Sequence, residues 1–234
     1  MADFSYESIP AGYYDKIYRK TSGIQSKWHH LKFQHVYGML RPCGRLLDVG
    51  CGPGTFVGNI PMEMTCYGVD ISKNQIEYAN EHYGQVATYS CNYPKCNLPD
   101  DKFDYITLLE VIEHIKLDSL QSLLVDIKKY IKPTGRMILT TPNYASLYPI
   151  LEAVVNKISP VSYEDQHISK FNKNILYSLL SDLGFYNIKI HSFLNISPFL
   201  AGISWKLSSN VFTLEEHLPF GFLLCASAGV YNEE

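Results

Sequence analysis

The stretch Leu46-Leu47-Asp48-Val49-Gly50-Cys51-Gly52-Pro53-Gly54-Thr55 decides the fold of this chain. It has the pattern of a short buried strand that runs into a glycine-rich turn, where the backbone can approach a ligand without collision with a Cβ. A second apolar run, Cys66-Tyr67-Gly68-Val69, ends in Asp70. A strand, a glycine turn, a helix and a second strand ending in an acid are typical of a nucleotide pocket at the edge of a parallel sheet. We therefore predict a ligand containing adenosine, with Asp70 accepting hydrogen bonds from both ribose hydroxyls.

Strands and helices alternate along the rest of the chain. This alternation predicts an α/β fold, a Rossmann-like sheet of seven mostly parallel strands with helices on both faces. The strands are expected at 45–49, 65–70, 86–90, 103–109, 137–141, 185–192 and 222–230. The helices are expected at 13–22, 24–40, 73–83, 117–131 and 173–183, with Ser72 as an N-cap and a brief helix after the glycine turn.

The chain has no internal repeat and no long polar linker, so residues 1–234 are predicted to form a single domain. Residues 1–44 would form an N-terminal helical cap, and residues 45–192 the ligand-binding core. Two aromatic and leucine-rich segments, 144–172 and 194–221, follow the fifth and sixth strands, and insertions there lie where α/β proteins bind substrates. The alternative that both segments simply extend the core remains open.

Composition excludes several classes of protein. The net charge of −3 gives no overall reason to expect a nucleic-acid partner. No signal peptide is expected at the N-terminus, and the absence of an apolar run of about 18 residues predicts no transmembrane segment. Six cysteines without a Cys-x-x-Cys pair predict free buried thiols in a cytoplasmic protein. No metal site is expected, and His29, His30 and His35 are expected on a solvated helix face.

The residues around the glycine turn discriminate between adenosine ligands. A dinucleotide fingerprint would place a glycine at position 55, where this chain has Thr55. The carboxylate of Asp48, two residues before the first glycine, would repel a pyrophosphate and attract an amino group or a sulfonium. A cationic cofactor is therefore favoured over the nicotinamide dinucleotide of an NAD-linked oxidoreductase.

At these positions the sequence resembles the class I S-adenosylmethionine-dependent methyltransferases, in particular those that act on small molecules. The matching segments are Leu-Asp-Val-Gly-Cys-Gly-Pro-Gly-Thr (47–55), Gly-Val-Asp-Ile-Ser (68–72), Leu-Pro-Asp-Asp-Lys-Phe-Asp (98–104), Leu-Glu-Val-Ile-Glu-His-Ile (109–115), Ile-Lys-Pro-Thr-Gly-Arg (131–136) and Thr-Thr-Pro-Asn (140–143). The resemblance covers roughly residues 45–192. It implies an enzyme with S-adenosyl-L-methionine as cofactor and S-adenosyl-L-homocysteine as product.

The resemblance also implies roles for individual residues of the turn. Asp48 and the backbone of Gly50 and Gly52 would hold the amino group and carboxylate of the methionine moiety, and Cys51 and Gly54 would complete this binding turn.

The remaining implied cofactor residues lie elsewhere in the chain. Asp70 would bind the ribose hydroxyls and Ile71 would pack on the adenine. Asn92 would replace the acid that the family often places after the third strand, and Glu110 would meet the cofactor after the fourth. Tyr14 lies in an N-terminal helix that would close over the cofactor; ordinary helix packing is the alternative.

Methyl transfer requires in-line attack on the methyl group, and a hydroxyl nucleophile must also lose its proton. His114, just past the fourth strand, and His167, in the insertion after the fifth, are the candidate catalytic residues. A structural role for His114, which would fix its loop, is the alternative.

Apolar side chains of the two insertions predict a small or lipid-like organic acceptor, methylated on oxygen or nitrogen. The expected wall consists of Tyr144, Leu147, Tyr148, Ile150, Leu151, Phe193, Phe199, Leu200, Ile203 and Trp205. The Asn-Pro-Pro-Tyr type of motif found in base-methylating enzymes is absent after the fourth strand, so no nucleic-acid acceptor is expected. A protein methyltransferase and a cofactor-binding module without turnover remain alternatives, and the oligomeric state is left open. The second insertion could form a lid, a subunit contact or a membrane-facing surface.

Overall fold

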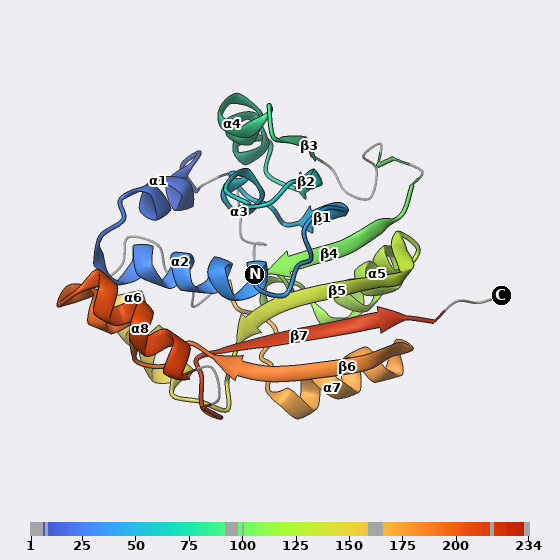
Figure 1. Ribbon diagram of the computed structural model, residues 1–234. Helices are drawn as coiled ribbons and strands as arrows, with labels where there is room; N and C mark the ends of the chain where they lie inside the picture. Colours follow the sequence, from blue (N-terminus) through green and yellow to red (C-terminus); the bar gives the residue numbers. More distant parts are fainter. Residues whose placement is uncertain are drawn as a thin grey trace.

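The computed structural model describes residues 7, 9–91, 98–99, 101–158, 166–215 and 218–231 (Figure 1). Its centre is a seven-stranded sheet in the order β3-β2-β1-β4-β5-β7-β6. Neighbours among the first five strands are parallel, whereas β7 runs antiparallel to both β5 and β6. The strands are β1 (Arg45–Val49), β2 (Thr65–Asp70), β3 (Ala87–Cys91), β4 (Phe103–Leu109), β5 (Ile131–Pro142), β6 (Phe185–Phe193) and β7 (Leu223–Val230). The predicted α/β fold is confirmed.

Helices cover both faces of this sheet (Figure 1). They are α1 (Tyr13–Arg19), α2 (Gly23–Tyr37), α3 (Thr55–Gly58), α4 (Lys73–Tyr83), α5 (Leu117–Lys128), α6 (Tyr148–Ile158), α7 (Lys173–Asp182) and α8 (Trp205–Glu215), with short 3₁₀ helices η2 (Ile112–His114) and η3 (Ser197–Gly202). As predicted, Ser72 caps α4, its hydroxyl accepting a hydrogen bond from the backbone N–H of Gln75.

Alternation along the strands divides the core into two layers. Leu46 of β1 packs with the face covered by α2, α3 and α4, while its neighbour Leu47 packs with the face covered by α5 and α7. Successive side chains of a strand point to opposite faces, so a strand buried on both faces is expected to be mostly apolar. This expectation explains Leu46, Leu47 and Val49 of β1, and the buried Asp48 is the exception.

The end of the expected helix 117–131 and the start of the expected strand 137–141 differ in the structure. Helix α5 ends at Lys128, and β5 already begins at Ile131, which pairs with Phe103 of β4. Pro133 cannot continue a helix, as expected, but the following residues extend the sheet instead of forming a separate turn. At Gly135 an added Cβ would lie 2.8 Å from the carbonyl oxygen of Phe103, so glycine permits this close pairing.

Two further expectations can be compared with the structure. Cys51, Cys66 and Cys225 are buried, but Cys43 is exposed, so the prediction of buried thiols was wrong for that residue; it follows Pro42 in the loop before β1. Across the described ranges, no helix is both long and apolar enough to cross a membrane.

Candidate active site

The glycine turn lies at the carboxyl end of β1, before α3. Gly50, Gly52 and Gly54 adopt φ values of 76°, 52° and 75°, a region that side chains with a Cβ rarely occupy. An added Cβ would lie 2.5 Å from Val111 at Gly50 and 2.9 Å from the Tyr89 ring at Gly54. The turn therefore needs glycine for both its conformation and its packing.

Asp70, at the end of β2, is already fastened to this turn. Its Oδ2 accepts a hydrogen bond from the Gly52 N–H at 2.8 Å, and its Oδ1 accepts one from the Ser72 N–H at 2.8 Å. Burial raises the pKa of Asp70, and these backbone hydrogen bonds oppose that rise. The carboxylate is thus held beside the turn, with Ile71, 63% exposed, at its side.

Asp48 lies inside the carboxyl end of β1. It is 3% exposed, and its Oδ1 accepts a hydrogen bond from the Thr107 hydroxyl at 2.6 Å. Burial raises the pKa of Asp48 to about 7; the Thr107 hydrogen bond opposes this rise, Asp70 adds to it and Lys32 opposes it. A buried carboxylate with little compensation is suited to receive a cationic group of a ligand.

A cavity of about 2170 Å³ connects the turn to the loop after β4. Most of the predicted cofactor residues and both candidate catalytic histidines line it: Tyr14, Asp48, Gly50, Cys51, Gly52, Asp70, Ile71, Glu110, His114 and His167. Gly54, the last glycine of the turn, is buried and does not line the cavity. Asn92 lies outside the described residues.

Glu110 also lines this cavity, and its backbone conformation is unusual for a residue other than glycine. Its φ is 57°, in the left-handed region, directly after the end of β4. Its carboxylate pairs with the ammonium of Lys32 from α2, a side chain only 4% exposed. Burial acts to raise the pKa of Glu110, but the charge and the hydrogen bond of Lys32, together with His29 and His167, outweigh burial and the pKa is lowered. Backbone conformations of this kind concentrate at functional sites.

Glu113, one turn further along, is fully buried. Its Oε2 accepts a hydrogen bond from the Thr141 hydroxyl at 3.0 Å, whereas its Oε1 has no hydrogen-bond partner within the described part of the chain. Burial, followed by repulsion from Glu110, raises the pKa of Glu113 to about 8. Buried carboxylate oxygens are normally satisfied, so an orphaned one indicates a place for a proton, an ion or a ligand.

His114 and His167 lie next to Glu113, with their ring centroids 4.9 Å apart. The Nδ1 of His114 lies 3.0 Å from the carbonyl oxygen of Gln166, to which it can donate. The Nδ1 of His167 contacts the carboxylate of Glu152, a residue of α6. Burial lowers the pKa of His114 to about 4 and also lowers that of His167, which Glu152 partly restores.

One potential ligand atom from each of Glu113, His114 and His167 lies within 4.8 Å of the others. Histidines that bind a metal usually direct their second nitrogen to a carboxylate or a backbone carbonyl, which is the arrangement of His167 with Glu152 and of His114 with Gln166. The set could therefore hold a divalent cation or act on a proton.

The expected apolar wall is realised only in part. Tyr148, Leu151 and Phe199 line the cavity. The others do not line it. Leu147, Ile150 and Ile203 are largely exposed, Phe193 is in the core, and Tyr144, Leu200 and Trp205 are also absent from the lining. Helix α6 turns only one face inward, and η3 with α8 packs mainly against α2, so most of the second insertion supports that helix.

The prediction of a solvated face for the histidines of α2 was wrong. His29 lines the cavity, and burial lowers its pKa to about 3. His30 stacks on the Tyr18 ring with centroids 3.9 Å apart, and His35 contacts His191. The reason is that α2 is enclosed by α1, η3 and α8, so a helix with no amphipathic pattern is buried on several sides.

Sequence reasoning missed several residues of this site: Lys32, Glu113 and Glu152. Glu113 lies within the quoted segment 109–115, so its spacing from Glu110 was a usable signal. Lys32 and Glu152 lie in helices without a motif, and only tertiary packing brings them to the cavity.

Comparison with known proteins gives consistent results. The family model described as a methyltransferase domain matches residues 26–190. The ubiquinone biosynthesis O-methyltransferase of Rickettsia prowazekii is 27% identical over 203 residues, covering 81% of this chain and 78% of that protein. The enzyme of the same name from Rickettsia canadensis is 29% identical over 174 residues, covering 71% of each.

Solved structures share the fold at low identity. An S-adenosylmethionine-dependent methyltransferase of Thermotoga maritima, described as a possible histamine N-methyltransferase, superposes with a TM-score of 0.67 at 18% identity, covering 92% of this chain and 93% of that one. Magnesium protoporphyrin IX methyltransferase of Synechocystis, with bound S-adenosylhomocysteine, gives a TM-score of 0.60 at 15% identity and covers 93% and 92%.

Proposed function

This chain belongs to the methyltransferase-domain family of class I S-adenosylmethionine-dependent methyltransferases, and on that premise we propose that it methylates a hydroxyl oxygen of a phenolic, lipid-like acceptor. Its cofactor is S-adenosylmethionine. Oxygen as the methylated atom is supported by the relatives named as O-methyltransferases of ubiquinone biosynthesis.

The observation that carries the proposal is that one cavity has two chemically different ends. At one end, Asp48 and the glycine turn offer negative charge and backbone groups to a methionine moiety, and Asp70 offers a carboxylate to a ribose. At the other end, Glu113 and His167 lie among apolar side chains of α6 and η3. A cofactor in the first end would direct its methyl group toward the second.

The reaction is a displacement in which the acceptor oxygen forms a bond to the methyl carbon as the carbon–sulfur bond breaks. The sulfonium becomes a neutral thioether, and the hydroxyl proton must go to a base. In this proposal the ionised carboxylate of Glu113 receives that proton, and His167, which Glu152 orients through Nδ1, lies beside it. A divalent cation held by Glu113, His114 and His167 would act in a different way, because it would lower the pKa of a bound hydroxyl and the proton would leave to solvent.

The apolar wall supports an acceptor with a lipid-like tail. Tyr148 and Leu151 of α6 and Phe199 of η3 line the same cavity as His167, and Trp28 of α2 adds a further ring. Apolar walls with a few convergent polar groups are typical of sites for small organic ligands.

The proposal is tested by product analysis. The purified protein, incubated with methyl-labelled S-adenosylmethionine, should transfer label to a hydroxyl of a catechol with a short isoprenoid tail. The same compound with both hydroxyls already methylated serves as the control and should yield no product. Label found instead on an aliphatic amine or on a protein side chain, or no S-adenosylhomocysteine formed with any acceptor, would overturn the assignment.

Binding of the cofactor should depend on pH through Asp48. Its pKa is about 7 in the free protein, and a cationic ligand favours its ionised form, so the affinity should fall as the pH decreases below about 7. We expect a loss of up to about tenfold per pH unit between pH 7 and 5, and a plateau above pH 8. Calorimetric titration checks this, with Asp48→Asn as the variant that should bind weakly and without this pH dependence. A pH-independent affinity in the parent protein would separate Asp48 from the cationic group.

A further inference from the structure

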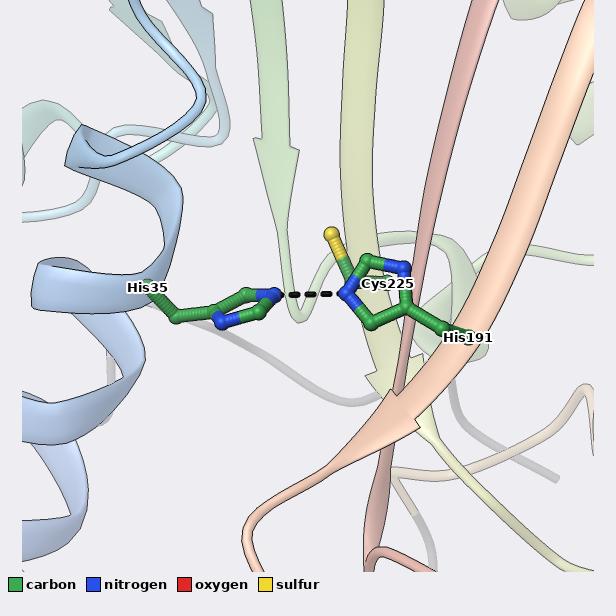
Figure 2. A group of neighbouring side chains, drawn as sticks. All are labelled: His35, His191 and Cys225. Atoms are coloured by element: carbon green, nitrogen blue, oxygen red, sulfur yellow. Dashed lines mark hydrogen bonds between the residues drawn. The ribbon is translucent and has the colours of Figure 1, made fainter. Parts of the chain in front are cut away.

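A second cluster of potential metal ligands lies apart from the active-site cavity. His35 comes from α2, His191 from β6 and Cys225 from β7, and Figure 2 shows the two imidazoles and the thiol turned toward one another. The Nε2 atoms of the two histidines are 2.7 Å apart, and the ligand atoms of all three residues lie within 4.8 Å of one another. None of the three lines the cavity described above.

The thioether of Met39, a fourth potential metal ligand, lies next to Cys225. The Sδ of Met39, in the segment directly after α2, lies 3.5 Å from the Cys225 Sγ. Two imidazoles, one thiol and one thioether make up a nitrogen and sulfur donor set. Such a set suits a thiophilic ion such as Zn²⁺ or copper and does not suit Mg²⁺ or Ca²⁺, which prefer oxygen.

Aromatic side chains surround the cluster. The His35 ring stacks on Phe193 with centroids 4.2 Å apart, and Phe212 of α8 lies edge-on to it. An apolar shell of this kind holds the ring in place and excludes competing water.

We propose that His35, His191 and Cys225 bind a Zn²⁺ ion, with Met39 as a fourth, weaker donor, and that this ion fastens α2 to the antiparallel edge of the sheet. Zinc–nitrogen bonds of about 2.0–2.1 Å in tetrahedral geometry require the two nitrogens to separate to about 3.3 Å. The ion replaces their mutual hydrogen bond, and the proton of that bond moves to the other nitrogen of the same ring. The Cys225 thiol loses its proton to solvent as the zinc–sulfur bond forms, so one proton is released for each ion bound.

An ion at this position would also affect the active-site cavity, because α2 contributes residues to both. Helix α2 carries His29 and Lys32 to the cavity on its earlier turns, and His35 lies in its last turn. A metal bond at the end of this helix therefore restricts how the whole helix can move over the cavity. This site is independent of the acceptor chosen above, so its test does not depend on methyl transfer.

The test is a titration of the chelator-treated protein with Co²⁺, which takes the place of Zn²⁺ and reports a bound thiolate by an intense charge-transfer band. We expect one band-producing site, displacement of the band by Zn²⁺, and an increase in Tm with Zn²⁺. Cys225→Ser should abolish the band, and His191→Asn should weaken Co²⁺ binding at least tenfold. Cys66→Ser removes another buried thiol, in β2, and is the matched control that should retain the band.

Circular dichroism of each variant verifies folding, and the two variants change separate elements, so failure of one to fold leaves the other informative. The cluster at Glu113 contains no thiol and cannot produce the charge-transfer band, which separates the two sites. Absence of the band in the folded parent protein, or its persistence in Cys225→Ser, would overturn the proposal and leave the two histidines as a hydrogen-bonded pair.

Discussion

Replacing Asp70 with alanine is expected to weaken binding of S-adenosylmethionine at least tenfold, which corresponds to about 1.4 kcal/mol. Two effects add. The ribose hydroxyls would lose their carboxylate acceptor, and the Gly52 and Ser72 N–H groups would lose the hydrogen bonds that now hold the turn beside β2. Isothermal titration calorimetry with S-adenosylhomocysteine and S-adenosylmethionine measures the change directly.

Two further variants test whether the loss of affinity is specific to the carboxylate of Asp70. Asp70→Asn keeps one side-chain oxygen that can accept a backbone hydrogen bond, so it should bind the cofactor better than the alanine variant and more weakly than the parent protein. Asp182→Ala changes an exposed acid at the end of α7 and should leave the affinity unchanged. An unaltered dissociation constant for Asp70→Ala, in a protein that melts at the parent temperature, would remove Asp70 from the cofactor site.

Replacing Glu113 with glutamine should reduce turnover by about 10²–10⁴-fold, the usual contribution of a group that handles a proton in the transition state. Glutamine has nearly the same shape and retains an oxygen for Thr141, so the loop should keep its conformation. The cofactor end of the cavity is untouched, and the affinity for S-adenosylmethionine should stay within about twofold of the parent value. Single-turnover kinetics with a phenolic acceptor, combined with calorimetry, separates these two quantities.

The matched control is Glu77→Gln on the exposed surface of α4, which should not alter turnover. Treatment with a chelator then distinguishes the two ways in which the cluster can act. Loss of activity that Mg²⁺ restores would mean that Glu113, His114 and His167 hold a cation, because the nitrogen and sulfur cluster at Cys225 does not suit Mg²⁺. Full activity after chelation would mean that the side chains receive the proton themselves. Turnover unchanged in Glu113→Gln would contradict both.

The core of the fold was predictable because its signals are local. A buried strand, three glycines with positive φ and an acid at the end of the next strand are all determined by short stretches of chain, and β1, β2 and β4 begin and end at the expected residues. The strand β5 was predicted too short, because pairing of Ile131 with Phe103 depends on a neighbouring strand and not on the residues themselves.

The residues of the candidate site also divide into those that the sequence predicted and those that only the structure revealed. Asp48 and Asp70 are attached to the turn that contains the signal, so their spacing along the chain already placed them together. Lys32 reaches the cavity from α2, a helix without an amphipathic pattern, and Glu152 reaches it from α6; only tertiary packing brings these two charged side chains to the cavity. The same limitation explains why the histidines of α2 were assigned to solvent, although three surrounding elements enclose them.

The sequence by itself determined the fold class, the glycine turn and the cofactor, because a backbone that approaches a ligand closely requires particular residues at fixed spacing. Only the tertiary structure decided which side chains line the cavity together with Glu113 and His167, and that His35, His191 and Cys225 meet. Those contacts join helices and strands that are distant in the chain. Their proximity follows from the packing of whole elements, and no short stretch of sequence encodes it.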